Sequence, residues 1–266
     1  MTSLRVNRET PGIALLTMSR PASLNALDSG LMAEFYEALA GLGQDSGVRV
    51  IILTGEGRAF CSGQDIRDFG GPIPELTDGP DALLTFQQYM SRIVAAVREV
   101  PQPVIAAVNG AAVGGGMALA CAADIRLATP AARFGVGAVR LGLSGCEMGL
   151  SYHLPRLVSM SAAAEWMLTG RLVGADEALA AGLVSRIVGA PELLPAAGEL
   201  AAAIIGNAPF GIRMTKRVMW ANLDEADLAR ALDRENKAQV LAVMTQDAAE
   251  ARAAFLERRP PRFIDR

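Results

Sequence analysis

Apolar positions change their spacing along the chain, and this change divides it into two parts. Over residues 1–190, short apolar runs typical of buried strands alternate with longer stretches in which apolar residues recur at helical spacing. The predicted strands are 4–9, 13–18, 48–53, 104–108, 124–128 and 184–188, and the predicted helices are 28–41, 82–100, 117–123, 161–169 and 175–181. From Pro191 onward the pattern is helical throughout, over 192–205, 209–220, 224–244 and 246–258. We therefore expect an α/β core over 1–190 and a helical C-terminal region over 191–266.

One stretch, PVIAAVNGAAVGGGMALACAAD at 103–124, joins an apolar predicted strand to a predicted helix through three consecutive glycines. Glycines directly before a helix let the backbone approach a ligand, and the free N–H groups of the first turn favour a negative oxygen. Glycines in this place also allow a helix to pack closely on a strand. From this stretch alone, an oxyanion or phosphate site and simple close packing remain equal alternatives. The glycines do not match the dinucleotide or P-loop patterns.

Composition narrows the classes of function. The chain has 266 residues, about half of them apolar (51%), and a net charge of −3, which gives no basic face for nucleic acid. Its three cysteines are widely spaced and fit reduced thiols in a cytoplasmic protein. We see no signal peptide and no apolar run of membrane-spanning length. With one histidine, His153, and no G-x-S-x-G motif, neither a zinc site nor a serine hydrolase triad is indicated.

Three stretches together resemble the enoyl-CoA hydratase/isomerase family, the crotonase superfamily. They are RPASLNAL at 20–27, AFCSGQDI at 59–66 and the glycine stretch extended to 103–125, and two later stretches at 168–188 and 255–263 also match. The resemblance implies an α/β fold, a crotonase-type spiral of ββα units with a helical C-terminal region that serves in oligomerisation. It also implies a homotrimer or a dimer of trimers. The implied substrate is an acyl-CoA thioester, with no metal and no cofactor other than the CoA of the substrate.

The resemblance also assigns the residues of the site. The backbone N–H groups of Gln64 and Gly115 would hold the thioester oxygen while negative charge develops on it. Residues of the matched stretches that would line the substrate site are Ala22, Ser62, Asp65, Ile66 and Gly114. Arg258 matches a position from which a basic residue reaches a CoA phosphate, often that of a neighbouring subunit. Arg20 and Arg67 are further candidates for the phosphates.

The departures from the family pattern bear on the reaction. The positions of the two glutamates that hydratases of this family use are Ala118 and Ala138 here, and alanine can neither activate water nor move a proton. A different carboxylate, Glu147, lies in a glycine-lined apolar stretch. Allowing for a one-residue difference in loop length, it matches the catalytic aspartate of relatives such as dienoyl-CoA isomerase and chlorobenzoyl-CoA dehalogenase. The alternative is that Glu147 is the N-cap or a first-turn acid of a helix.

Two functions follow from these departures. The first is double-bond isomerisation, or related chemistry through a thioester enolate, with Glu147 as the acid and base. The second is a non-catalytic relative that only binds acyl-CoA. The Gly- and Pro-rich segment 70–80 is expected to be a surface loop that shapes the acyl pocket, but it has no signature of a particular acyl chain.

Overall fold

Two sheets form the α/β core in residues 2–67 and 78–265, the part of the chain that the computed structural model describes. The larger sheet has the order β1 (Leu4–Asn7), β2 (Gly12–Met18), β3 (Val48–Gly55), β5 (Val104–Val108), β7 (Ile125–Ala128), β10 (Arg186–Ile187). The smaller has the order β4 (Ala59–Cys61), β6 (Ala111–Val113), β8 (Arg133–Gly135), β9 (Val173–Gly174). After the hairpin β1–β2, which lies within the larger sheet, the pairs β3–β4, β5–β6 and β7–β8 each place one strand in each sheet and are followed by a helix. This repeat is the ββα spiral that the sequence led us to expect.

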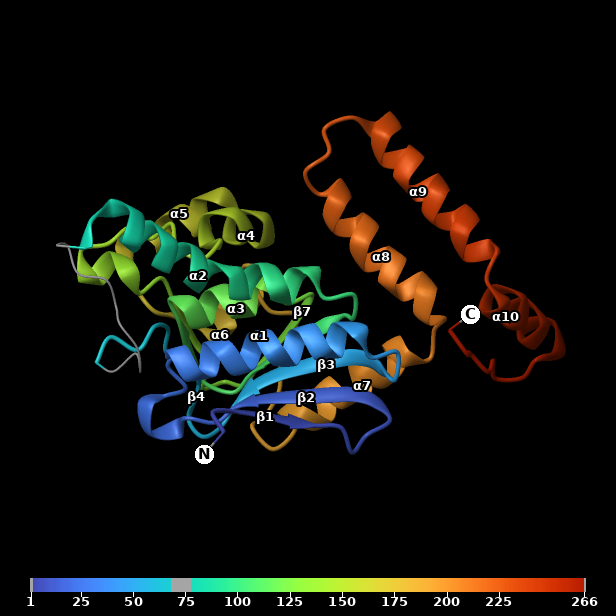
Figure 1. Ribbon diagram of the computed structural model, residues 1–266, viewed down its shortest axis with the longest axis horizontal. Coiled ribbons are helices and arrows are strands. Elements are labelled where there is room, and N and C mark those ends of the chain that lie inside the picture. Colours follow the sequence, from blue (N-terminus) through green and yellow to red (C-terminus); the bar gives the residue numbers. More distant parts are fainter. Residues whose placement is uncertain (1, 68–77, 266) are drawn as a thin grey trace.

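Helices cover both faces of the larger sheet (Figure 1). On one face lie α1 (Ser29–Gln44), α2 (Pro80–Glu99) and α3 (Gly115–Ala122), and on the other lies α7 (Leu193–Ile205). Ile51 and Leu53 of β3 pack with the first group, whereas the intervening Val50 and Ile52 pack against α7. Because alternate side chains of a strand point to opposite faces, a strand covered on both sides has a continuous apolar run. The core is completed by α4 (Leu150–Leu157), α5 (Met160–Thr169) and α6 (Ala175–Ala180).

The expected elements are present, and the differences concern short segments. The strands β4, β6 and β8 were not predicted, because three residues are too few to show a period. Asp28 caps α1 as expected, since its side chain accepts the N–H of Leu31 at 2.7 Å. Most of the predicted loop 70–80 lies outside the described residues, and Pro80 already begins α2.

The last three helices, α8 (Pro209–Asn222), α9 (Leu228–Val243) and α10 (Gln246–Glu257), extend away from the core (Figure 1). We refer to residues 209–265 as the C-terminal arm. The preceding helix α7 is packed on the sheet, so the division of the chain at residue 190 and an oligomerisation role for 191–266 stay predictions.

No single described helix has the length and hydropathy to cross a bilayer. The pair of helices α7 and α8, bent by 106° relative to each other, satisfies that test by length and composition. Large apolar side chains exposed on the arm include Leu228, Val240, Met244, Phe255 and Leu256.

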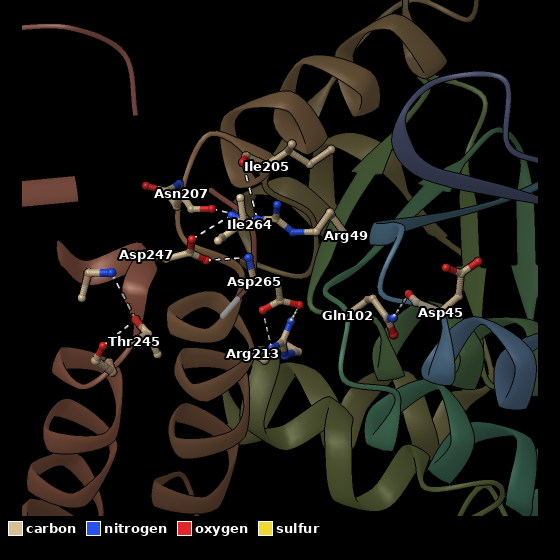
Figure 2. A network of polar contacts seen from close by, with 12 residues as sticks. Asp45, Arg49, Gln102, Ile205, Asn207, Arg213, Thr245, Asp247, Ile264 and Asp265 are labelled. Atoms are coloured by element: carbon tan, nitrogen blue, oxygen red, sulfur yellow. Dashed lines mark hydrogen bonds and ion pairs between the residues drawn. The ribbon is translucent and has the colours of Figure 1, made fainter. Parts of the chain in front are cut away.

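A network of polar contacts holds the arm where it leaves the core (Figure 2). Arg49 of β3 donates to the carbonyl of Asn207 in the α7–α8 turn at 2.8 Å. Arg213 of α8 forms two hydrogen bonds of 2.7 Å with Asp265, near the end of the chain. The fully buried Asp247 accepts the backbone N–H groups of Ile264 and Asp265. The C-terminal residues are therefore fastened to the base of α8.

A buried ion pair ties α8 to the core. The Lys216 ammonium lies 2.9 Å from the Asp124 carboxylate and donates to the carbonyl of Gln102 at 2.9 Å. Asp124 also accepts from the Trp220 indole at 2.7 Å and from the backbone N–H of Val104 at 2.8 Å. Asp124 therefore has a structural role, since it joins α8 to the start of β5.

Replacing Lys216 by methionine is expected to destabilise the protein by about 1.5–3 kcal/mol, because it removes a hydrogen-bonded cation from the largely buried Asp124 carboxylate and leaves only the Arg98 guanidinium, at 3.9 Å, as its ion-pair partner. Lys237→Met is the matched control, since its ammonium pairs with Asp233 on the surface of α9. Such exposed pairs contribute at most about 0.5 kcal/mol. Urea denaturation of both variants measures the difference, and equal losses of stability would contradict a buried, energetically coupled pair.

Candidate active site

An open cleft of about 800 Å³ lies where the two glycine turns meet. Four segments line it: residues 20–26, 58–67, 113–115 and 137–147. Every site residue predicted from the sequence, except Arg258, lines this cleft: Ala22, Ser62, Gln64, Asp65, Ile66, Gly114, Gly115 and Glu147. The fold thus brings together residues that are far apart in the sequence.

Pairing with Leu27 sets the direction of the Gln64 backbone. Gln64 forms an isolated parallel bridge with Leu27, whose N–H donates to Gly63 at 2.8 Å and whose carbonyl accepts from Asp65 at 2.9 Å. In a parallel bridge, the two residues flanking the central one make the hydrogen bonds, so the N–H of Gln64 points to the other side. Within the described residues this N–H donates to no backbone acceptor. Gln64 therefore presents a free donor at the cleft.

Gly115 supplies a second N–H, at the start of α3. Gly114, the residue before the helix, has φ 53° and ψ −121°, a conformation open to glycine, and its own N–H is taken by the Gly135 carbonyl at 2.8 Å. As the first residue of the helix, Gly115 has no intrahelical acceptor for its N–H, and in the part of the chain described it has no other backbone acceptor. A Cβ at Gly63 would stand 3.4 Å from the Gly115 nitrogen, so the two turns are in contact.

The Glu147 side chain is directed at these turns. Its Oε1 lies 3.3 Å from the position that a Cβ on Gly114 would occupy, and the backbone N–H of Ala138 is near the carboxylate. Burial raises the pKa of Glu147, and the nearby Ala138 N–H offsets only part of that rise. Helix α4 begins after Gly149 without a side-chain cap, so Glu147 neither caps it nor lies in its first turn. The alternative of an N-cap or a first-turn acid is therefore wrong.

The other acid of the cleft, Asp65, already has an ion-pair partner. Asp65 is buried and forms an ion pair with Arg20 at 3.1 Å, and the same guanidinium lies 2.9 Å from Asp28. This pairing fastens the 20–28 loop to the turn at Gln64. Among the described residues, Glu147 is thus the carboxylate of the cleft that has no ion-pair partner. Of the two alanines that the resemblance places at the glutamate positions, Ala138 lines the cleft, whereas Ala118 is fully buried in α3 and does not.

Cations line one part of the cleft. Arg58 and Arg67 are exposed, and neither forms an ion pair with any residue that the structure describes. They are available for the phosphates of a ligand, whereas Arg20 is held by its two carboxylates. Arg258 is exposed at the end of α10 and does not line this cleft, so its contact with CoA, from a neighbouring copy, stays a prediction.

Other candidates lie outside the cleft. His153 is buried on α4, and burial, together with nearby arginines, lowers its pKa to about 4. Within the described residues there is no group of three or more metal-ligating side chains. Among the cleft residues that the sequence analysis did not propose are Arg58 and, on the Glu147 loop, Leu141 and Leu143. The signal for the two leucines was present, since L-G-L places two large apolar residues in a segment rich in Gly and Ser.

Comparison with known proteins identifies the family. The family model "Enoyl-CoA hydratase/isomerase" matches residues 8–266. A probable enoyl-CoA hydratase from Mycobacterium bovis is 42% identical over 262 residues, which is 98% of this chain and 92% of that protein. The crystal structure of a probable enoyl-CoA hydratase/isomerase from Mycobacterium abscessus superposes with a TM-score of 0.91 at 39% identity, covering 100% of both chains.

A monofunctional enoyl-CoA isomerase from Mycobacterium smegmatis is also similar. Its structure superposes with a TM-score of 0.74 at 40% identity and covers 87% of this chain and 99% of its own. The family model, which matches residues 8–266, spans the two glycine turns and the loop of Glu147. On this evidence the chain belongs to the enoyl-CoA hydratase/isomerase family.

Proposed function

We propose that the protein is an isomerase of enoyl-CoA thioesters, in which Glu147 moves a proton along the acyl chain. The observation on which this depends is a single carboxylate, free of an ion pair in the described residues, directed at two backbone N–H donors. Donors fixed in place stabilise the charge of an enolate oxygen without reorganising. A carboxylate beside them can take a proton from the acyl carbons and return it.

The proposed reaction needs no group besides the Glu147 carboxylate and the backbone N–H groups of Gln64 and Gly115. Glu147, ionised, removes a proton from the α-carbon of a 3-enoyl thioester, and the electrons of the C–H bond move onto the thioester oxygen as a dienolate. The N–H groups of Gln64 and Gly115 hold this oxygen. The protonated Glu147 then donates the proton to the γ-carbon, which leaves a 2-enoyl thioester and regenerates the carboxylate. Since no electrons leave the substrate, we propose that no metal or redox cofactor takes part and that CoA enters only within the substrate.

Hydration makes a different demand on the site. Adding water to a double bond needs one group that activates the water and a proton delivered to the α-carbon. Where the family's hydratases have two glutamates, this chain has Ala118 and Ala138, and Glu147 is left to act alone. A proton shift needs one acid–base group, so isomerisation fits the chemistry of this cleft better than hydration. The similarity to the monofunctional isomerase from M. smegmatis supports this choice.

The same cleft could serve a relative that only binds acyl-CoA. Against this alternative, burial raises the pKa of Glu147, which brings it closer to the working range of a general base. An acid kept only for structure would be expected to form an ion pair or a cap.

The exposed apolar side chains of the C-terminal arm support our proposal of a homotrimer or dimer of trimers, since surface of this kind is usually buried between subunits.

Incubation of a 3-enoyl-CoA in heavy water separates these functions. We expect conversion to the 2-enoyl-CoA with deuterium at the α- or γ-carbon, measured by mass spectrometry and proton NMR. A binder would leave the thioester unchanged and free of deuterium. Faster formation of a 3-hydroxyacyl-CoA from the 2-enoyl-CoA than isomerisation would show a hydratase, and the proposal would then be wrong.

A further inference from the structure

Two exposed leucines line the cleft on the loop that carries the acid. Leu141 and Leu143 are 60% and 65% exposed, and both are part of the cleft wall. Single exposed leucines are common on protein surfaces and need no explanation. Two on one side of a ligand-sized cleft, next to a candidate catalytic acid, present apolar surface to whatever occupies it.

The backbone holds both leucines in place. Leu141 ends a short 3-10 helix, Ala138–Leu141, and Gly142 follows with φ 78°, a left-handed conformation suited to glycine. The N–H of Gly142 donates to Val139 at 3.2 Å, and the N–H of Leu143 donates to Ala138 at 3.1 Å. The N–H of the same Ala138 is near the Glu147 carboxylate. One hydrogen-bonded turn therefore holds the two leucines on the segment that also carries Glu147.

The cations of the cleft and the two leucines lie on different segments, although the exposed Ile66 also lines the cleft beside Arg67. The cations Arg58 and Arg67 belong to residues 58–67, which carry Gln64, whereas both leucines belong to residues 137–147, which carry Glu147. In the proposed function, the thioester oxygen is held at Gln64 and Gly115 and the reacting carbons face Glu147. The part of the acyl chain beyond those carbons then continues along the Glu147 segment.

We propose that Leu141 and Leu143 bind the distal part of the acyl chain, and that the substrates are thioesters of apolar acyl chains of medium to long length. This inference rests on the proposed function for the placement of the thioester. Each methylene that leaves water against an apolar side chain stabilises the complex, so affinity rises with chain length. A four-carbon acyl group ends too soon after its reacting carbons to gain much from these contacts.

Binding of saturated thioesters tests this inference without turnover. Butanoyl-CoA and decanoyl-CoA are titrated into the full-length protein by isothermal calorimetry. Wild type is expected to bind decanoyl-CoA about 10- to 100-fold more tightly than butanoyl-CoA. In the double variant Leu141→Ser/Leu143→Ser, this ratio is expected to fall by about tenfold or more. The pair Leu141→Ile/Leu143→Ile, which keeps the apolar surface, should retain most of the wild-type ratio.

Leu168→Ser/Leu179→Ser is the matched control, because these two leucines are exposed at 78% and 41% on α5 and α6 and do not line the cleft. It should leave the ratio unchanged. A wild-type ratio near one, or an unchanged ratio in the Leu141→Ser/Leu143→Ser variant, would overturn the inference. The outcome is independent of the isomerisation assay, since a protein that binds long chains but converts none would refute only the proposed function.

Discussion

Replacing Glu147 by glutamine is expected to lower the rate of isomerisation by about 10²–10⁴, because the amide keeps the shape of the side chain but cannot accept a proton. The loss should appear in kcat, with little change in the dissociation constant of a saturated acyl-CoA. Glu199→Gln, on the exposed surface of α7 and outside the cleft, is the control and should not change the rate. Full activity of Glu147→Gln on every thioester that wild type converts would remove Glu147 from the mechanism.

The pH dependence of the wild-type rate follows from the environment of this carboxylate. Burial raises the pKa of Glu147 above its ordinary value, with the N–H of Ala138 opposing the rise. Because the ionised form is the base, the rate should fall as the pH drops through the raised pKa. Glu147→Gln should lose this acidic limb of the profile. If the rate falls only at the pH values at which an ordinary carboxyl group is protonated, Glu147 is not the group that titrates.

Glu147→Gln should raise the stability of the protein although it lowers the activity. The folded protein binds the Glu147 proton more tightly than the unfolded chain, so ionised Glu147 lowers the free energy of unfolding above the raised pKa. Glu147→Gln is therefore expected to be the more stable protein at neutral pH. The difference should shrink as the pH falls through the raised pKa and vanish below the ordinary value, where both states are protonated. Urea midpoints measured across this range test the sign.

Replacing Gly115 by proline is expected to lower the rate by about 10²–10³, the cost of losing one oxyanion donor. Proline is well suited to the first position of a helix, since its ring fixes a helical φ and the missing N–H has no intrahelical partner there. The preceding Gly114 is not in a helical conformation, which is also what a following proline requires. The variant thus removes the donor while α3 can still form.

Gly115→Ala separates the donor from the added bulk. A Cβ at this position would meet the Met148 sulfur at 2.9 Å and Leu27 Cδ1 at 3.0 Å, both ends of flexible side chains that can shift. Alanine and proline both introduce this carbon, but only alanine keeps the N–H. The ratio of the alanine rate to the proline rate therefore measures the donor itself. Two variants of equal activity, both folded by circular dichroism, would show that Gly115 is there only for close packing.

Much of the core could be predicted from the sequence because its determinants are local. The apolar run of β3 predicts a strand buried on both faces, and the Asp28 side chain marks the beginning of α1. The glycines at 114–116 indicate a close backbone approach, and a lone acid in an apolar loop points to Glu147. Strand periodicity, capping and glycine conformations are properties of a few consecutive residues, so they can be read without knowledge of distant neighbours.

The site itself depends on contacts between distant segments. The direction of the Gln64 N–H follows from its bridge to Leu27, and the Glu147 carboxylate approaches Gly114, which is 33 residues before it in the chain. Neither contact is visible in a local pattern. The sequence alone left open whether Glu147 caps a helix, and it did not single out Leu141 and Leu143.

The sequence by itself determined the family, the strand–helix order and the residue types available for chemistry. Only the tertiary structure decided which of them meet, since the cleft is assembled from four segments separated by long stretches of chain. It also decided the course of the C-terminal arm, which Arg49, Asp247 and Asp265 fix through contacts across the fold. Such contacts form only when the whole chain has paid its conformational entropy, so no short window of sequence contains them.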